Sequence, residues 1–397
     1  MPEDVLLVLG PRRQPPVVCP PSNTPNSIAI LTSVGFRHLD MEEYIDAVQK
    51  LKPDIVVGLA DLVVGQPPGI KRKSKMVDRT HAYTMDATET LYGEAVPEEK
   101  RSETAYFAPV LPLDNAQQSI YLEDLEDEMK PLISGLALYE TASLSIIPEG
   151  LGDLPRLLFS APRTPQDILR EVALGADLVT IPFVGGTSDV GMALHFTYPT
   201  PASYNTPSTN PLDLALDLWS STYKTDTRPL IEDCPCYTCQ THHRAYIHHL
   251  LTAREMLAWT LLQIHNYATM DLFFANIRAS IRQGTFEQDT QAFERTYASQ
   301  LPEKTGDGPR CVFVHLDLPS LPGLIDDTGF EDTISRHRDR INRVKIPGNT
   351  GTSTTQLRST QGLRRRRRRR RRRLLLPRVI LERTNFRNRG LQRSLVD

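Results

Sequence analysis

A cluster of three cysteines constrains this chain more than any other feature. Cys234, Cys236 and Cys239 lie within six residues, in the pattern Cys-x-Cys-x2-Cys. Thiolates are strong zinc ligands, and a structural zinc site closes with four protein ligands. In a reducing compartment such a cluster more often holds a metal ion than forms disulfides. The spacing therefore predicts a metal site.

A histidine completes the predicted ligand set. His265 lies deep in the helix predicted after the cysteines, so a metal ion bound here would staple a loop to that helix. Four histidines nearer in sequence could compete for the fourth position: His242, His243, His248 and His249. Because four protein ligands leave no open coordination position, we predict one structural Zn2+ ion. Its ligands would be Cys234, Cys236, Cys239 and His265.

Charge is divided unevenly along the chain. Residues 311–397 carry 21 Lys and Arg against 8 Asp and Glu, a net charge of +13, and residues 1–310 carry 25 against 40, a net charge of −15. With this negative charge, residues 1–310 repel nucleic acid overall. Binding to RNA would therefore require a local basic surface or a basic partner. The segment 66–76 reads as a basic loop. Its lysines and arginine, Lys71-Arg72-Lys73-Lys75, are either a phosphate contact or a solvated surface.

Short apolar runs alternate with helical stretches from about residue 25 to 195. The runs are typical of buried parallel strands and lie at 54–59, 105–111, 132–138, 156–161 and 177–182. Helices are predicted over 113–129 and 164–174. The second has Thr164 as N-cap, Pro165 in its first turn and Gly175 after its end. Repeated βα units of this kind predict an α/β fold with a parallel sheet or barrel.

The remaining segments complete the predicted organisation. Residues 197–230 are rich in Pro, Thr, Ser and Asp and are predicted to be a disordered surface insertion. Residues 241–283 are predicted to be one helix with an apolar stripe that packs in the core. The stripe consists of Leu250, Leu251, Ala253, Met256, Leu257, Thr260, Leu261 and Ile264.

Three domains follow from this organisation. We predict a partial βα-barrel over 1–230, a zinc-binding helical subdomain over 231–310 and a disordered basic tail over 311–397. The tail contains ten consecutive arginines, Arg364 to Arg373, which repel one another and cannot form a core. An RNA-binding or nuclear-import arm is the alternative for the tail. No stretch reaches the ~20 apolar residues of a membrane span and no signal peptide is evident, so we expect a cytoplasmic protein.

The cysteine block and several shorter motifs resemble the tRNA-guanine transglycosylase family over roughly residues 15–310. The block is Cys-x-Cys-x2-Cys followed by 25 residues and His265. The shorter motifs are H-R-A-Y-I-H-H-L-L (243–251), I-H-N-Y (264–267), K-P-D-I (52–55), K-M-V-D-R (75–79), S-G-L-A-L (134–138), G-A-D-L (175–178) and G-M-A-L-H-F (191–196). The resemblance implies a zinc-bearing TIM-like (β/α)8 barrel. It also implies that this chain begins part-way into that barrel, which would leave it N-terminally truncated.

The resemblance further implies a chemistry that this chain has lost. Family members exchange guanine for a 7-deazaguanine base at the tRNA wobble position, through an aspartate nucleophile. That position falls on Thr180, and a threonine hydroxyl without a neighbouring base is a poor nucleophile. The family aspartate that reads the guanine base falls on Ala60, with Asp61 one position later. Asp177 is expected to cap the strand entrance, because period 2 places it on the opposite face from Thr180.

Three functions remain open from the sequence. The favoured one is a non-catalytic subunit that pairs with a catalytic queuine tRNA-ribosyltransferase subunit and acts on position 34 of tRNAs with a G-U-N anticodon. In the family the zinc domain helps form the subunit interface, so the helix after the cysteines is the expected contact. The alternatives are an active transglycosylase with a different nucleophile, and a zinc-dependent RNA-binding module that relies on the arginine tail.

Overall fold

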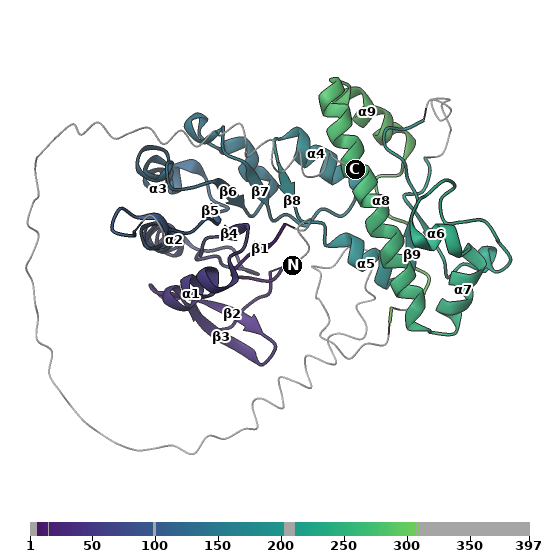
Figure 1. The fold of residues 1–397 in the computed structure, drawn as a ribbon, viewed down its shortest axis with the longest axis horizontal. Coiled ribbons are helices and arrows are strands. Elements are labelled where there is room, and N and C mark those ends of the chain that lie inside the picture. The colour runs from purple at the N-terminus through teal and green to yellow at the C-terminus, as the bar shows by residue number, and fades with distance from the viewer. Residues whose placement is uncertain (1–5, 15, 98–100, 202–210, 307, 310–397) are drawn as a thin grey trace, which may run out of the picture. The chain divides into compact units, whose positions relative to one another are not determined.

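A sheet of six parallel strands forms the centre of the fold (Figure 1). The computed structural model describes residues 6–14, 16–97, 101–201, 211–306 and 308–309. The strands lie side by side in the order β1, β4, β5, β6, β7, β8. Their bounds are Val8–Leu9, Ile55–Val57, Ala105–Val110, Gly135–Leu138, Arg156–Leu158 and Leu178–Val179. Each of the five predicted apolar runs contains one of these strands, which confirms the parallel βα organisation.

The described strands make a curled, open sheet, as expected for part of a barrel; the full (β/α)8 barrel and its N-terminal truncation stay predictions. Closure of a barrel requires every strand to pair on both sides. In the described part of the chain β1 pairs only with β4 and β8 only with β7, so both remain edge strands. All residues of β5 and β6 are buried, as in the middle of a parallel sheet covered on both faces.

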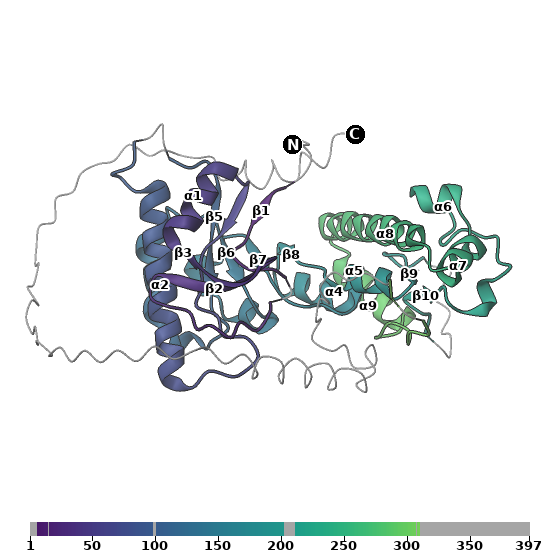
Figure 2. The same cartoon turned by 90° about the horizontal axis from the view of Figure 1, so that it is seen from below.

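Four helices alternate with these strands (Figures 1 and 2). They are α1 Met41–Leu51, α2 Ile70–Tyr92, α3 Ser119–Asp124 and α4 Pro165–Ala173. The helix predicted over 113–129 is divided: a 3-10 turn at Asn115–Gln117 precedes α3, and a π-helical turn at Leu125–Met129 follows it. The apolar faces of α1, α2 and α3 share one large core with the sheet, in which Val48, Tyr83 and Tyr121 are buried. Ile168 and Leu169 of α4 belong to a second core.

Helix α4 confirms its predicted ends. The N–H of Asp167 donates to Thr164 Oγ1 at 3.4 Å, and the N–H of Thr164 donates to Asp167 Oδ2 at 3.2 Å, which is a reciprocal capping box. Pro165 occupies the first turn. Gly175 follows the helix with φ +97°, a conformation that favours glycine.

A β-hairpin precedes α1 and was not predicted. Strand β2 Ser27–Thr32 pairs antiparallel with β3 Gly35–Asp40. Its turn residues, Ser33 and Val34, are not those that usually mark a two-residue hairpin loop, so the sequence carried no clear signal. Ile28 and Ala29 of β2 are fully buried, which joins the hairpin to the core.

The single helix predicted over 241–283 is wrong, because the structure has three helices there. They are α6 Tyr237–Thr241, α7 Arg244–Thr252 and α8 Met256–Gln283. The chain breaks between α7 and α8 at Arg254, whose φ of +57° no α-helix accommodates. The predicted core stripe is also wrong in part. Leu250, Leu251 and Leu261 are buried. The other five residues of the stripe are exposed: Ala253, Met256, Leu257 (44%), Thr260 and Ile264 (39%).

The prediction of a basic loop over 66–76 is wrong from Ile70 onward. Helix α2 begins at Ile70 with Gly69 as its N-cap, so the basic run lies on its first turns. Lys and Arg are good helix formers, and composition alone could not separate a solvated helix from a solvated loop.

The prediction of a disordered insertion over 197–230 is wrong for its described part, which excludes residues 202–210. Strand β10 Ala215–Asp217 pairs antiparallel with β9 Met192–Leu194, and a 3-10 turn follows at Ser221–Tyr223. Leu214, Leu218 and Leu230 are fully buried. Apolar residues between the polar ones therefore anchor this segment.

The C-terminal described elements pack around α8. Helices α5 Phe183–Asp189 and α9 Phe286–Thr296 both contact it, and rings of Phe273, Phe293 and Tyr198 meet in an aromatic core. All described residues lie within one compact unit. None of the described helices is long and apolar enough to cross a membrane. The predicted basic tail lies outside the described residues, and the predicted domain boundaries stay predictions.

Candidate metal centre

The three cysteines converge because a short helix follows the first two. Cys236 is the N-cap of α6, and its sulfur accepts the N–H of Cys239 at 3.4 Å. Asp233, just before the cluster, has φ +60°, which turns the chain sharply into it. Thr238 is buried, and its hydroxyl donates to the carbonyl of Leu261 on α8, so α6 is fixed against that helix.

His265 brings the fourth ligand from α8. Its imidazole is fully buried, and Nδ1 lies 4.0, 3.6 and 3.4 Å from the sulfurs of Cys234, Cys236 and Cys239. All four ligand atoms lie within 4.8 Å of one another. A tetrahedral zinc ion with typical bond lengths separates its nitrogen and sulfur ligands by about 3.6 Å. The group therefore has the dimensions to hold a metal ion.

The other ring nitrogen of His265 fixes the orientation of the ring. Nε2 lies 2.9 Å from the carbonyl oxygen of Leu194 in β9, so it carries the proton and donates it there. Nδ1 then directs its lone pair at the sulfurs. A metal-bound histidine commonly has such a second hydrogen bond, which sets its tautomer.

The competing histidines lie elsewhere. His248 Nδ1 is 2.9 Å from the carbonyl oxygen of Leu218, and His243 accepts the N–H of Tyr246 as N-cap of α7. The ring of His242 stacks on Tyr246 at 5.0 Å. Among the described residues, the only group with the geometry of a metal site contains His265.

The electrostatics of the cluster favour a bound cation. Burial raises the pKa of Cys236, but hydrogen bonds from His265 and from the N–H of Cys239 outweigh it and bring the pKa to about 6. Burial lowers the pKa of His265, but hydrogen bonds with the sulfurs of Cys234, Cys236 and Cys239 outweigh it and hold that pKa well above its ordinary value. The lowered pKa of Cys236 favours the thiolate, which is the form that binds metal ions.

Thr180 lies directly after β8, at the position that the resemblance aligns with the nucleophile. Its hydroxyl donates to the carbonyl oxygen of Ser160 at 3.2 Å, and its N–H donates to Leu158. The hydroxyl is therefore engaged by the backbone rather than by a general base. Asp177 Oδ2 accepts the N–H of Arg156, the first residue of β7, which agrees with the expected role at the strand entrance.

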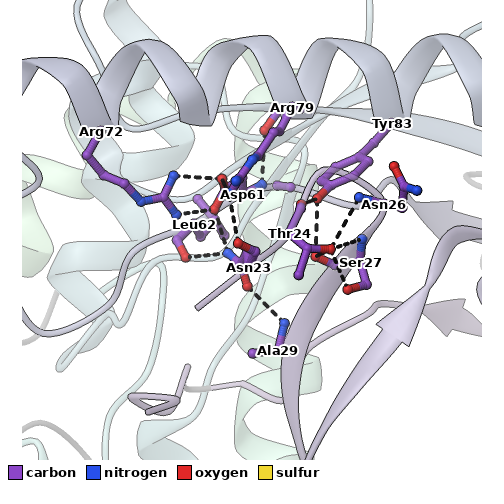
Figure 3. A network of polar contacts seen from close by, with 12 residues as sticks. Asn23, Thr24, Asn26, Ser27, Ala29, Asp61, Leu62, Arg72, Arg79 and Tyr83 are labelled. Atoms are coloured by element: carbon purple, nitrogen blue, oxygen red, sulfur yellow. Dashed lines mark hydrogen bonds and ion pairs between the residues drawn. The ribbon is translucent and has the colours of Figure 1, made fainter. Parts of the chain in front are cut away.

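Asp61 is held by three neighbouring side chains. It follows Ala60 and is fully buried. Its carboxylate accepts bonds from Asn23 Nδ2 at 2.5 Å, Arg72 Nη1 at 2.7 Å and Arg79 Nη1 at 3.0 Å (Figure 3). Arg72 Nη2 makes a further bond to it. Burial would raise the pKa of Asp61, but these bonds outweigh it and hold the pKa below its ordinary value.

Arg12 extends this network to Ala60 itself. Its guanidinium donates to the carbonyl oxygen of Ala29 at 2.9 Å, to Asn23 Oδ1 at 3.3 Å and to the carbonyl oxygen of Ala60 at 3.5 Å. A cation thus lies against the position where the resemblance places a base-reading aspartate. Sequence reasoning missed this network, because its members are up to 67 positions apart (Arg12 to Arg79).

A buried carboxyl group near Thr180 was also missed. Glu171 of α4 is 3% exposed and lines a cavity of about 190 Å³ together with Ser160 and Thr141. Thr141 Oγ1 donates to Glu171 Oε1 at 3.0 Å. Burial raises the pKa of Glu171, which the hydroxyls of Ser160 and Thr141 partly offset. One sequence signal existed: Glu171 lies three residues after Ile168, on the apolar face of α4.

Glu171→Gln is expected to stabilise the protein at pH 7 by about 1 kcal/mol. A carboxyl group with a raised pKa contributes stability while protonated, and that contribution is lost as the pH rises through the folded-state pKa. The amide stays neutral and keeps an oxygen for Thr141. Urea unfolding at pH 4.5 and pH 7 measures the effect, which should be larger at pH 7. A variant less stable than the wild type at pH 7 would contradict it.

Together, a parallel βα sheet and a Cys3His group between a loop and a long helix define an α/β protein with a candidate metal centre. The chain belongs to the queuine tRNA-ribosyltransferase family, whose model matches residues 4–299. It is 36% identical over 315 residues to queuine tRNA-ribosyltransferase accessory subunit 2 of Schizosaccharomyces pombe, covering 79% of this chain and 69% of that one. It is 29% identical over 305 residues to the Xenopus tropicalis protein of the same name, covering 67% and 72%.

Proposed function

We propose that this chain is the non-catalytic subunit of a heterodimeric queuine tRNA-ribosyltransferase. It would support the exchange of guanine for queuine at wobble position 34 of the tRNAs for Asp, Asn, His and Tyr. One observation carries the proposal: the nucleophile position is Thr180, whose hydroxyl is bonded to a backbone carbonyl at 3.2 Å. The relatives' name, accessory subunit 2, agrees with a chain that works beside a catalytic one.

The base-reading region supports the same conclusion. The carboxylate nearest to Ala60 in sequence is that of Asp61, and four hydrogen bonds from three side chains already occupy it. The guanidinium of Arg12 lies against the Ala60 carbonyl. A purine that bound to Asp61 would have to break these buried hydrogen bonds. The hydrogen bonds that a neutral base could form in their place are weaker and would not offset that cost.

The metal ion is assigned a structural role. Cys234, Cys236, Cys239 and His265 would hold Zn2+, which suits three thiolates and one imidazole in tetrahedral geometry. Four protein ligands leave no position for substrate, so the ion would supply only a crosslink between the α6 loop and α8. Thiols kept free for metal binding also agree with a reducing cytoplasmic location.

The partner is proposed to bind the exposed face of α8. Leu257, Ile264 and Tyr267 are 44%, 39% and 48% exposed and recur at helical spacing. On α6 and α7, which both contact α8, the aromatic rings of Tyr237, His242 and Tyr246 pack on one another with centroids 5.7 and 5.0 Å apart. Exposed apolar side chains gathered in this way mark protein interaction sites, and aromatic residues are enriched at their centres.

Ile264→Asp is expected to weaken association with the catalytic subunit by about 30-fold or more, because it places a charge in the centre of an apolar contact. Met85→Asp is the matched control, since Met85 is 47% exposed on the distant helix α2. Sedimentation velocity of the two purified subunits measures the affinity. Equal affinities of both variants would exclude the α8 face as the interface.

A second function is favoured by one observation, the buried Glu171. An active transglycosylase needs a carboxylate near Thr180, and Glu171 lines the same cavity as Ser160, whose carbonyl Thr180 contacts. If Glu171 were the nucleophile, the chain alone would exchange labelled guanine into tRNA, and Glu171→Gln would abolish that activity. The proposed non-catalytic role requires that the chain alone have none.

A further inference from the structure

The first three turns of α2 carry a strongly basic surface on an otherwise acidic body. Five cationic side chains occur between residues 71 and 79, against one acidic residue, Asp78. No acidic residue lies in the first turn of this helix. Residues 1–310 as a whole carry a net charge of −15. These five residues therefore form a local basic surface on a protein whose residues 1–310 are acidic overall.

The structure divides these cations into two groups. Arg72 and Arg79 are bonded to the buried carboxylate of Asp61 and fix the start of α2 to the segment after β4 (Figure 3). The three lysines remain. Lys71 and Lys75 are exposed and make no side-chain bond to any described residue, and Lys73 Nζ reaches only Gln117 Oε1 at 3.3 Å. Lys71 and Lys75 are four residues apart and lie on one side of α2, whereas Lys73 lies on the opposite side. We call Lys71 and Lys75 the lysine face.

The lysine face lies at the rim where parallel βα folds bind their ligands. Helix α2 follows β4, and Asp61, to which its first turns are bonded, comes four residues after the end of that strand. Gln117, the neighbour of Lys73, lies in the turn after β5. Both contacts place the start of α2, which carries the lysine face, at the carboxyl ends of neighbouring parallel strands, which is the ligand-binding edge of such sheets.

This arrangement opposes the stability of the helix. Lys71 and Lys75 are four residues apart, so their like charges repel on one face. Cations in a first turn also repel the positive end of the helix dipole. Proteins retain locally unfavourable residues of this kind mostly at functional sites, such as ligand-binding sites. A polyanion would relieve both repulsions at once.

We propose that the lysine face binds the phosphate backbone of RNA. The inference rests on the proposed function, in which the substrate is a tRNA, and it names the surface of this chain that holds it. Lysines act as point charges toward phosphates and position the RNA without reading its sequence. A membrane surface fits less well, because only two large apolar side chains of α2, Ile70 and Met85, are much exposed, and they lie about four turns apart. Met76, Val77 and Tyr83 are buried in the core.

Lysine footprinting of the full chain tests the proposal residue by residue. The chain is acylated with and without a synthetic tRNA anticodon stem-loop, and the modified lysines are quantified by mass spectrometry. Lys71 and Lys75 are expected to be protected severalfold by the RNA. Lys50 on α1, which is exposed and paired with Asp46, is the internal control and should react equally in both samples. Because each lysine is read separately, binding by the arginine tail does not obscure the result.

Salt dependence provides the second readout. Replacing both Lys71 and Lys75 by Gln should make the slope of log K against log salt shallower by about 0.7–0.9 for each phosphate that these lysines no longer neutralise. Lys71→Glu should weaken RNA binding while leaving Tm unchanged or higher, since it removes the repulsion. Weaker binding by this variant therefore cannot be ascribed to unfolding.

Several results would overturn the proposal. They are equal acylation of Lys71 and Lys75 with and without RNA, an unchanged salt slope, or protection by phosphatidylserine vesicles but not by RNA, which would assign the face to a membrane. None of these measurements involves the catalytic subunit or base exchange. Failure here is thus separate from failure of the proposed heterodimer, which the α8 variants test.

Discussion

Cys236→Ser is expected to remove the bound metal ion and to destabilise the protein by about 5 kcal/mol or more. Cys236 is both a ligand and the N-cap of α6, and its sulfur lies 3.6 Å from His265 Nδ1. Without the ion, only hydrogen bonds to His265 Nδ1 would hold the sulfurs of Cys234 and Cys239 against α8. The α6 loop would separate from α8, and the proposed partner surface on both would be disrupted.

Metal content by mass spectrometry and thermal unfolding measure this effect. The wild-type chain should carry one Zn2+, the variant close to none, and its affinity for the catalytic subunit should fall with its stability. Cys19→Ser is the control, because Cys19 lies outside the cluster and bonds to the carbonyl of Val17. A Cys236→Ser variant that retains stoichiometric zinc and wild-type stability would refute the site.

Asp61→Asn is expected to destabilise the protein by about 3–5 kcal/mol, because removal of one partner of a buried ion pair leaves the other charges uncompensated. Asp61 is fully buried and receives bonds from Arg72, Arg79 and Asn23. The start of α2 would detach from the segment after β4. Asp46→Asn is the matched control: its pair with Lys50 is exposed and should contribute at most about 1 kcal/mol.

The same carboxylate predicts a pH dependence. The folded-state pKa of Asp61 lies below its ordinary value, so its contribution is fully present above the unfolded-state pKa and is lost as the pH falls through the folded-state pKa. Urea unfolding should therefore show wild type and Asp61→Asn converging below about pH 4. A constant difference between them down to pH 2 would mean that Asp61 is not held as an ion.

Local signals explain what the sequence could predict. The parallel strands follow from apolar runs, and α4 follows from Thr164, Pro165 and Gly175. The convergence of the cysteines on His265 follows from ligand chemistry and spacing. Each of these signals lies within one helix, one strand or one short motif, or comes from a residue type that binds metal ions.

Features decided by distant contacts could not be predicted. The basic run becomes helical partly because Arg72 and Arg79 find Asp61, 11 and 18 positions away. The break before α8 depends on the left-handed backbone conformation of Arg254, which cannot be predicted from an arginine in the sequence. Leu257 and Ile264 follow the same periodicity as core residues, yet they are exposed. Periodicity marks an apolar face without saying whether the same chain or a partner covers it.

We propose that this subunit supports the exchange of guanine without performing it. Incorporation of labelled guanine into tRNA, measured for the chain alone, for the catalytic subunit alone and for the complex carrying Thr180 or Thr180→Ala, tests it most directly. We expect no activity from the chain alone and equal rates, within about twofold, for the two complexes. Activity of the chain alone, or a rate reduced about a hundredfold or more by Thr180→Ala in the complex, would contradict the account.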